Sequence, residues 1–224
     1  MLGTSTTAGE GEAVARPDPE TTTPPAARAG RRRKQHARRE EVLDVAARMF
    51  FERGYEATTT QDIGAALGLL KGSIYYYISS KEDLLFELVQ QYHDDTRVYF
   101  ERILASDAAP LDKLRELITV ETAHTATNLT KSSLFYTEWR SLPAERQREI
   151  VAERTRHEKA VEQWIREAQA AGDVRADTDV RLATFAIFGM VNSVYRWFRP
   201  DGRRTAEEVG AEFSELVLGG LASR

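Results

Sequence analysis

The chain of 224 residues contains no cysteine. Disulfide bonds, thiol catalysis and thiolate metal sites are therefore excluded. The sequence also lacks an apolar run of the roughly 18 residues that a membrane-spanning helix needs, and its polar N-terminus does not have the pattern of a signal peptide. We therefore expect a soluble, cytoplasmic protein with no membrane partner.

An excess of positive charge is missing as well. The formal net charge is −4 and the isoelectric point is near 5.7, so any surface for nucleic acid has to be local. Apolar residues make up 42% of the chain, which allows a substantial core. The length suits a small domain joined to a larger one.

Motifs for catalysis are absent. The four histidines are far apart, and none stands three or four residues from another: His36, His93, His124 and His157. The sequence has no P-loop, dinucleotide-binding or nucleophile-elbow motif. We therefore expect no enzyme, no metal site and no cofactor.

The most informative stretch is TTTQDIGAALGLLKGSIYYYISSKEDLL, residues 58–85. It predicts two short helices joined by a glycine turn. Thr59 and Asp62 have the spacing of a capping box, and Gly68 ends the first helix. A second helix of about two turns is expected from Lys71. A further capping-box pattern, Ser80 with Asp83, then opens a long helix.

Two helices and a glycine turn within about 20 residues form the helix-turn-helix pattern, whose second helix enters the major groove of DNA. Helical hairpins with such a turn also occur in proteins that bind nothing, so the spacing alone leaves both interpretations open. The outward residues include a lysine, a serine and tyrosines, which donate hydrogen bonds to phosphate oxygens. Three adjacent tyrosines turn through about 200° on a helix, so at least one ring must face outward.

The segment from Glu41 to Leu85 resembles the DNA-binding domain of TetR-family transcriptional regulators, on the residues AARMFFERGYEATTTQDIGAALGLLKGSIYYYISSKEDLL. This resemblance implies an all-α fold, with a three-helix helix-turn-helix head and a body of roughly six helices for ligand binding and dimerisation. It also implies a regulator, usually a repressor. The chain departs from the family pattern at Leu70, where a capping Ser or Thr is common, and at Tyr77 with Ile78.

The resemblance also assigns roles in DNA binding. Lys71 and Gly72 are expected at base edges, because lysine reaches guanine acceptors and glycine allows close approach. Ser73 can contact a base or a phosphate. The expected phosphate anchors are Thr59, Tyr75, Tyr76, Tyr77 and Lys81. For Tyr75, a half-buried ring in the head is an equally open interpretation.

The chain is expected to divide into a disordered tail at 1–30, a helix-turn-helix domain with a basic arm at 31–79, and an effector-binding and dimerisation domain at 80–224. The basic run consists of Arg28, Arg31, Arg32, Arg33, Lys34, Arg38 and Arg39. It is either a solvated face or an arm that neutralises DNA phosphates. Deleting residues 1–34 distinguishes the two, because loss of an arm flattens the salt dependence of DNA binding.

Helical periodicity predicts every further element. The expected helices run from about Lys34 to Arg53, ended by Gly54; from Lys81 to about Leu104; from Pro110; around Leu134, Phe135 and Trp139; from Pro143 to Ala171, ended by Gly172; from Thr178 to Phe198; and from Thr205, capped with Glu208.

The last two helices are apolar around most of their circumference, so one face needs a partner. Small residues that allow close helix approach are Gly189, Gly210, Gly219 and Gly220. The resemblance implies a homodimer through a four-helix bundle, in which two recognition helices read a palindromic operator on double-stranded DNA. The other interpretation is that these faces only fill the core of the chain itself.

Polar groups on otherwise apolar helix faces are typical of a ligand pocket. The candidates for effector contact are Tyr92, Thr96, His124, Phe135, Trp139, Arg154, His157, Val161, Trp164, Phe188 and Asn192, together with Tyr195. Four of these candidates recur at spacings of three or four on one helix face: Arg154, His157, Val161 and Trp164. An arginine and a histidine at the mouth of an apolar cavity suit an acyl chain or ring system with an anionic head.

The stretch FGMVNSVYRWFRPDG, residues 188–202, more loosely resembles actinobacterial TetR regulators that control fatty-acid or steroid breakdown and respond to acyl-CoA esters. This implies a hydrophobic or acyl-CoA effector that releases DNA by shifting the population of conformations. A constitutive DNA-binding or protein-interaction module without an effector is the alternative.

Overall fold

The structure, a computed structural model, describes residues 25–222, with side chains from Arg33 onward. Within these residues it is built from helices and turns, and one isolated bridge pairs Val174 with Ala222. The predicted all-α fold is confirmed. Of the expected disordered tail, residues 1–24 lie outside the described residues, whereas residues 25–30 belong to the first helix.

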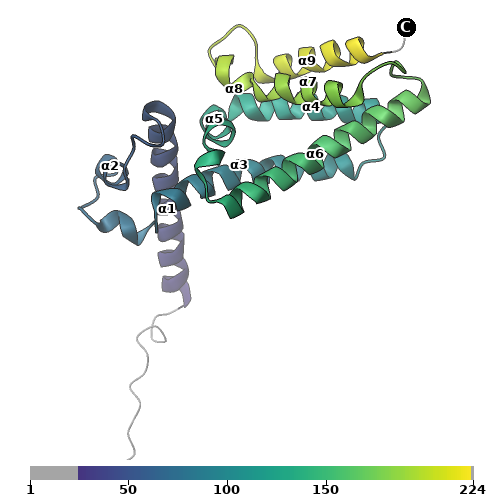
Figure 1. Cartoon of the computed structure of the whole chain (residues 1–224). Helices are drawn as coiled ribbons and strands as arrows, with labels where there is room; N and C mark the ends of the chain where they lie inside the picture. The colour runs from purple at the N-terminus through teal and green to yellow at the C-terminus, as the bar shows by residue number, and fades with distance from the viewer. Residues whose placement is uncertain (1–24, 223–224) are drawn as a thin grey trace, which may run out of the picture. The chain divides into compact units, whose positions relative to one another are not determined.

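Three elements make the head: α1 (Pro25–Arg53), α2 (Thr60–Ala66) and the 3-10 helix η2 (Ser73–Tyr76) (Figure 1). Helix α1 starts before the expected position near Lys34. Backbone contacts divide the chain into the units Met1–Arg39 and Glu40–Arg224, and α1 crosses this boundary. The first unit contributes, among the described residues, only the N-terminal part of α1.

The boundaries of α1 and α2 follow from local chemistry. Gly54 adopts a φ of +88° after α1, a conformation that glycine tolerates without strain. The Asp62 amide donates to Thr59 Oγ1 at 3.1 Å, and the Thr59 amide donates to Asp62 Oδ2 at 2.9 Å. These two bonds complete the predicted capping box.

The predicted two-turn helix from Lys71 is wrong. The segment instead forms the short η2, which begins after Gly72 in a left-handed conformation with a φ of +87°. No side chain caps its start, which fits the absence of a capping group at Leu70. Because Gly72 lies outside the right-handed helical region, only a short 3-10 turn forms between Ser73 and Tyr76.

The body contains α3 (Lys81–Leu104), α4 (Pro110–Thr127), α5 (Leu129–Thr137), the 3-10 helix η3 (Trp139–Ser141), α6 (Ala144–Ala171), α7 (Val180–Asn192), α8 (Val194–Trp197) and α9 (Ala206–Leu221). Ser80 caps α3 by accepting from the Asp83 amide, and Thr205 forms a capping box with Glu208. The expected single helix from Thr178 to Phe198 is interrupted at Ser193. No helix within residues 25–222 has the length and apolar character to cross a membrane.

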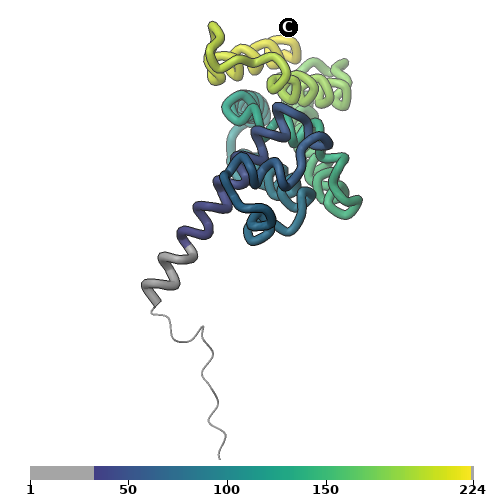
Figure 2. Tube along the Cα trace, turned by 90° about the vertical axis from the view of Figure 1, so that its left-hand side faces the viewer, coloured from purple at the N-terminus to yellow at the C-terminus, as the bar shows by residue number. Residues whose placement is uncertain are grey.

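Helices α7, α8 and α9 pack against α4 (Figures 1 and 2). The α4–α9 contact is very close at Gly210, where an added Cβ would lie 2.7 Å from the backbone oxygen of Thr119. The close helix approach expected at Gly210 is therefore confirmed, and this glycine fits α9 onto the chain's own α4.

One hydrophobic cluster links the head with the adjoining part of the body. It includes Ile63 of α2 and Ile74 of η2, continues along the first half of α3, and reaches Phe135 of α5 and Trp139 of η3. A second cluster fills the space between α3, α4, α6, α7 and α9. The first cluster gives a continuous packed connection between the helix-turn-helix and α5.

Candidate functional site

The outward side of η2 exposes several of the residues predicted to contact DNA. Lys71 and Gly72 are exposed, and the rings of Tyr75 and Tyr76 are 55% and 61% exposed. The expectation of at least one outward tyrosine is confirmed. The Tyr75 hydroxyl lies 3.1 Å from Thr60 Oγ1, which ties η2 to the start of α2.

The remaining tyrosine and the serine are less exposed. Ser73 and Tyr77 are half-buried. Tyr77 packs against the head cluster and meets Tyr76 edge to face, with ring centroids 5.1 Å apart. The Tyr77 ring therefore supports Tyr76 in its outward position.

Two predicted phosphate anchors already have partners inside the head. Lys81 Nζ lies 4.1 Å from the centre of the Tyr55 ring and 3.5 Å from the Glu56 carbonyl oxygen. Thr59 Oγ1 donates to Asp62 Oδ2 at 2.6 Å. Both side chains hold the helix-turn-helix together, so a DNA contact from either has to be made alongside these bonds.

Leu70 was not among the predicted contacts, yet its side chain is 82% exposed beside Lys71. A large apolar group at a DNA-facing turn can contact a thymine methyl group. The sequence does mark this position as unusual, because a leucine stands where the family commonly has a capping hydroxyl.

The body contains a partly open cavity of about 300 Å³ between α3, α4, α5, η3, α6 and α7. This volume is at the lower end of the range for small-molecule pockets. The lining residues are His93, Thr96, Glu121, Phe135, Tyr136, Trp139, Arg140, Arg154, His157, Glu158, Phe188 and Asn192.

The cavity brings together seven residues of the predicted effector set: Thr96, Phe135, Trp139, Arg154, His157, Phe188 and Asn192. The other five do not line it. Val161 and Trp164 are buried in the second cluster, and Tyr92 stacks on His124 while its hydroxyl lies 3.0 Å from Thr125 Oγ1. Tyr195 stacks on Tyr136, with centroids 5.4 Å apart.

Sequence reasoning missed five lining residues: His93, Glu121, Tyr136, Arg140 and Glu158. Glu158 adjoins His157 on α6. Glu121 gave no signal, because a glutamate in an amphipathic helix ordinarily lies on the solvent side.

Arg154 dominates the basic part of the cavity. Its guanidinium carbon lies 4.9 Å from the centre of the Phe135 ring and 4.6 Å from that of Trp139, so two aromatic faces hold the charge. Burial lowers the pKa of Arg154, but an arginine still remains charged at neutral pH.

Three buried nitrogen atoms at this cavity have no hydrogen-bond partner among the residues that the structure describes: His93 Nε2, Arg154 Nη2 and His157 Nε2. Buried polar groups are nearly always paired. An orphaned group costs about 1–3 kcal/mol. Because the Arg154 nitrogen can only donate, this cluster favours a ligand that brings a hydrogen-bond acceptor with negative charge to Arg154.

Both histidines are neutral at neutral pH. Burial is the largest cause that lowers the pKa of His157 to about 4, and the positive charge of Arg156 acts in the same direction. Burial also lowers the pKa of His93. Arg154 is therefore the positive charge of this cluster, and the imidazoles add hydrogen-bonding capacity around it.

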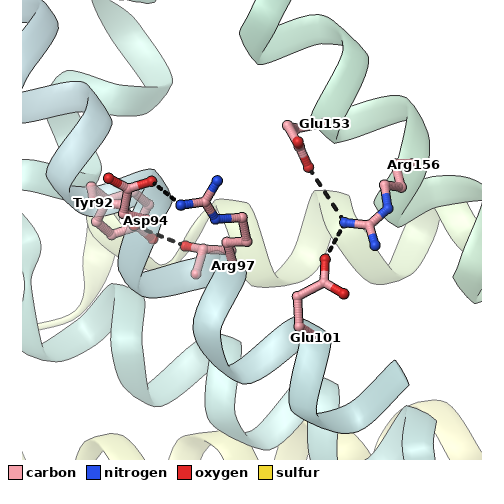
Figure 3. Close-up of polar contacts among 7 residues, drawn as sticks. Tyr92, Asp94, Arg97, Glu101, Glu153 and Arg156 are labelled. Carbon is pink, nitrogen blue, oxygen red and sulfur yellow. Dashed lines mark hydrogen bonds and ion pairs between the residues drawn. The ribbon is translucent and has the colours of Figure 1, made fainter. Parts of the chain in front are cut away.

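A second cavity of about 370 Å³ lies between α3 and α6 and shares His93 with the first. Its rim carries Asp94, Arg97 and Glu153. Arg97 pairs with Asp94 at 2.9 Å. Figure 3 shows this pair and also Arg156 between Glu101 and Glu153. Because these ion pairs are exposed, each stabilises the fold by at most about 1 kcal/mol.

Apolar side chains remain uncovered on α7, α8 and α9. Leu182, Phe185, Trp197 and Leu216 are each between 45% and 69% exposed. A Cβ added at Gly189, Gly219 or Gly220 would meet nothing within 4 Å. An exposed apolar face of this kind is typical of a protein–protein interface.

The fold and these surfaces define the class of helix-turn-helix transcriptional regulators. The chain belongs to the TetR family of bacterial regulatory proteins. The model of the family's regulatory domain matches residues 42–88, and the model of the tetracyclin repressor-like C-terminal domain matches residues 107–221. The resemblance stated from the sequence is thereby confirmed.

Known relatives are similar over most of the chain. The HTH-type transcriptional repressor KstR2 of Mycolicibacterium smegmatis is 31% identical over 188 residues, which cover 83% of this chain and 91% of that protein. The solved structure of the ketosteroid transcriptional regulator KstR2 of Mycobacterium tuberculosis superimposes with a TM-score of 0.79 at 31% identity, covering 84% of this chain and 96% of that one.

A further solved relative is AibR in complex with isovaleryl coenzyme A and operator DNA. It has a TM-score of 0.68 and 28% identity, and the match covers 83% of this chain and 98% of AibR. KstR2 is thus a transcriptional repressor, and AibR was solved bound to operator DNA.

Proposed function

We propose that this chain is a repressor that binds a palindromic operator as a homodimer and releases it when an amphipathic, anionic effector of the acyl-CoA class enters the cavity. The observation that carries the effector part is the cluster of unpartnered nitrogens at His93, Arg154 and His157. An effector that supplies acceptors to these atoms removes the cost of leaving them unpaired.

The cavity walls support the same class of ligand. Phe135, Trp139 and Phe188 provide aromatic surface for an acyl group, while Arg154 provides a charge for a polar head. Among the relatives, AibR was solved with isovaleryl coenzyme A and operator DNA. Carried over to this chain, that pairing joins an acyl-CoA site and a DNA site in one regulator.

Coupling between the two sites has a physical route. Phe135 and Trp139 line the cavity and also belong to the cluster that contains Ile63 and Ile74 of the head. An effector that draws Arg154 away from these rings changes the packing of α5 and η3 against the head cluster. DNA and effector then favour different conformations, and each lowers affinity for the other, typically by about 5- to 150-fold.

The dimer rests on the uncovered face of α7, α8 and α9. Two copies joined there present two copies of η2, and a two-fold particle matches a palindrome. Covering Phe185 and Leu216 in both copies removes apolar surface from water, which favours association.

Native mass spectrometry of the protein purified from its own host tests both parts. We expect a particle of twice the 25.3 kDa chain mass, with a retained molecule that fragments as an acyl-CoA. A monomer at micromolar concentration contradicts the dimer. An acyl-CoA that binds should add roughly 2.7 kcal/mol to the free energy of unfolding at about 100 times its dissociation constant. If high concentrations of acyl-CoA esters leave the free energy of unfolding unchanged, the effector class is contradicted.

A further inference from the structure

Glu121 has an unusual position for a carboxyl group. It lies on α4, is only 6% exposed and lines the cavity. Tyr99 of α3 donates a hydrogen bond to its Oε2 at 2.7 Å. Burial raises the pKa of Glu121 to about 7, and the groups that oppose this rise are the hydroxyls of Tyr99 and Tyr136, not a cation.

A buried carboxyl without a cation is costly, and an apolar residue of similar volume in its place is often more stable. Packing therefore does not explain the glutamate. Its neighbours are polar as well: Tyr136 of α5 donates to Asn192 Oδ1 of α7 at 2.9 Å, and both line the cavity. Three polar side chains from three helices thus form one corner of the cavity.

This polar corner is separate from the basic cluster. Arg154 lies on α6 and stacks on the rings of Phe135 and Trp139. Glu121 lies on α4 and accepts its hydrogen bond from Tyr99 of α3. An anionic group at Arg154 therefore leaves Glu121 to meet a different part of the same ligand.

We propose that Glu121, Tyr136 and Asn192 form a second polar subsite that binds a neutral hydroxyl or keto oxygen on the acyl part of the effector. A carboxylate accepts from a hydroxyl, and its protonated form donates to a ketone, so a group that titrates near neutrality serves either oxygen. The inference rests on the proposed effector class and narrows it to oxygenated acyl-CoA esters, since a plain acyl chain has no oxygen to form a hydrogen bond with these three side chains.

Calorimetric titration with matched ligands tests the subsite. Four-, six- and eight-carbon acyl-CoA esters are compared with the corresponding esters that carry a terminal hydroxyl. For the chain length that reaches the corner, we expect the hydroxylated ester to bind about five- to tenfold more tightly, the gain of one net hydrogen bond. Equal affinities at every length overturn the inference.

Two substitutions test whether Glu121 causes the preference for the hydroxylated ester. Glu121→Met removes the polar group at similar length, and we expect it to abolish or invert the preference for the hydroxylated ester. Glu158→Met removes another cavity carboxylate on α6 and should keep the preference. A preference that survives Glu121→Met overturns the assignment to this residue.

The design separates the two proposals. Plain and hydroxylated esters that bind equally contradict only the subsite. If no ester binds, the acyl-CoA class fails and the subsite fails with it. The ratio of two affinities is the readout, and a purely structural role of Glu121 does not change a ratio. If Glu121→Met does not fold, the wild-type comparison still decides.

Discussion

The imidazole of His157 lies flat on the ring of Phe100, with centroids 3.7 Å apart and an angle of 22° between the planes. This contact joins α6 to α3 beside the cavity. It buries the imidazole, and burial is the largest reason that the pKa of His157 falls to about 4.

The stack makes stability depend on pH. The unfolded histidine titrates near 6.5 and the folded one near 4, so between these values the unfolded state binds the extra proton. Stability therefore rises with pH across this window and is lost as pH falls through it. Across this window the free energy of unfolding changes by up to about 3 kcal/mol through His157, and we expect His157→Phe to remove this change. Urea unfolding at a series of pH values measures it. An unchanged slope contradicts the buried, neutral ring.

Glu121 predicts the opposite trend. Its pKa rises from 4.5 to about 7 on folding, so the folded state holds the extra proton between these values. Its contribution to stability is complete below about pH 4.5 and is lost as pH rises through 7. In the same unfolding series, Glu121→Gln should therefore gain stability relative to the wild type as pH rises from 5 to 8. A gain that is the same at every pH contradicts the raised pKa.

Arg154 should decide whether an anionic effector binds. Loss of a charge-assisted bond costs about 1.5–3 kcal/mol, so Arg154→Met should weaken acyl-CoA binding by roughly 10- to 100-fold in calorimetric titration. The thermal midpoint should not fall, because a buried guanidinium with an unpaired Nη2 is replaced by an apolar side chain.

Arg156→Met is the matched control. Arg156 lies two positions along α6 and pairs with Glu101 and Glu153 on the exposed side (Figure 3). We expect this variant to keep the effector affinity of the wild type. Equal losses from both substitutions would mean that the general charge of α6, and not the cavity, attracts the ligand.

Substitutions in and next to η2 should distinguish contacts that give DNA affinity from contacts that give sequence specificity. Tyr76→Phe removes one hydroxyl, and we expect DNA binding to weaken about fivefold on operator and unrelated DNA alike. Lys71→Ala should weaken operator binding more than binding to unrelated DNA, because it removes a base-edge contact. Fluorescence anisotropy at fixed salt measures both ratios, and exchanged outcomes would reverse the two assignments.

The uncovered face of α9 should be required for assembly. Leu216→Glu places a charge on this face, and we expect it to shift the particle to a monomer in sedimentation experiments and to abolish operator binding. Val98→Glu is the control, since Val98 is equally apolar and exposed but lies on α3. If Val98→Glu dissociates the particle and Leu216→Glu does not, the dimer face lies elsewhere.

Much of the fold could be predicted because the signals are local. The capping boxes of Thr59 with Asp62 and of Thr205 with Glu208 depend on residues three apart. Gly172 ends α6 in a left-handed conformation, as its position after an amphipathic segment indicates. Each of these bonds forms within a single turn, so the sequence contains the whole interaction.

The wrong predictions concern features that depend on packing between helices. Periodicity placed Arg154 and Trp164 on one helix face, but the helices packed against α6 determine which part of that face meets a cavity and which part meets the core. Glu121 shows the same limit, since burial of a carboxyl depends on α3, α5 and α7 together. At Gly72, a single left-handed residue shortened the expected recognition helix, and periodicity does not report such a turn.

The central claim is that DNA and the effector bind at two sites of one molecule and that each lowers the affinity for the other. Its most direct test is a titration of the operator complex with the acyl-CoA that binds most tightly, followed by anisotropy of labelled DNA. We predict release of the DNA from the wild type, and from Arg154→Met only at much higher ligand concentration. Saturation of the cavity with no change in DNA affinity would contradict the account.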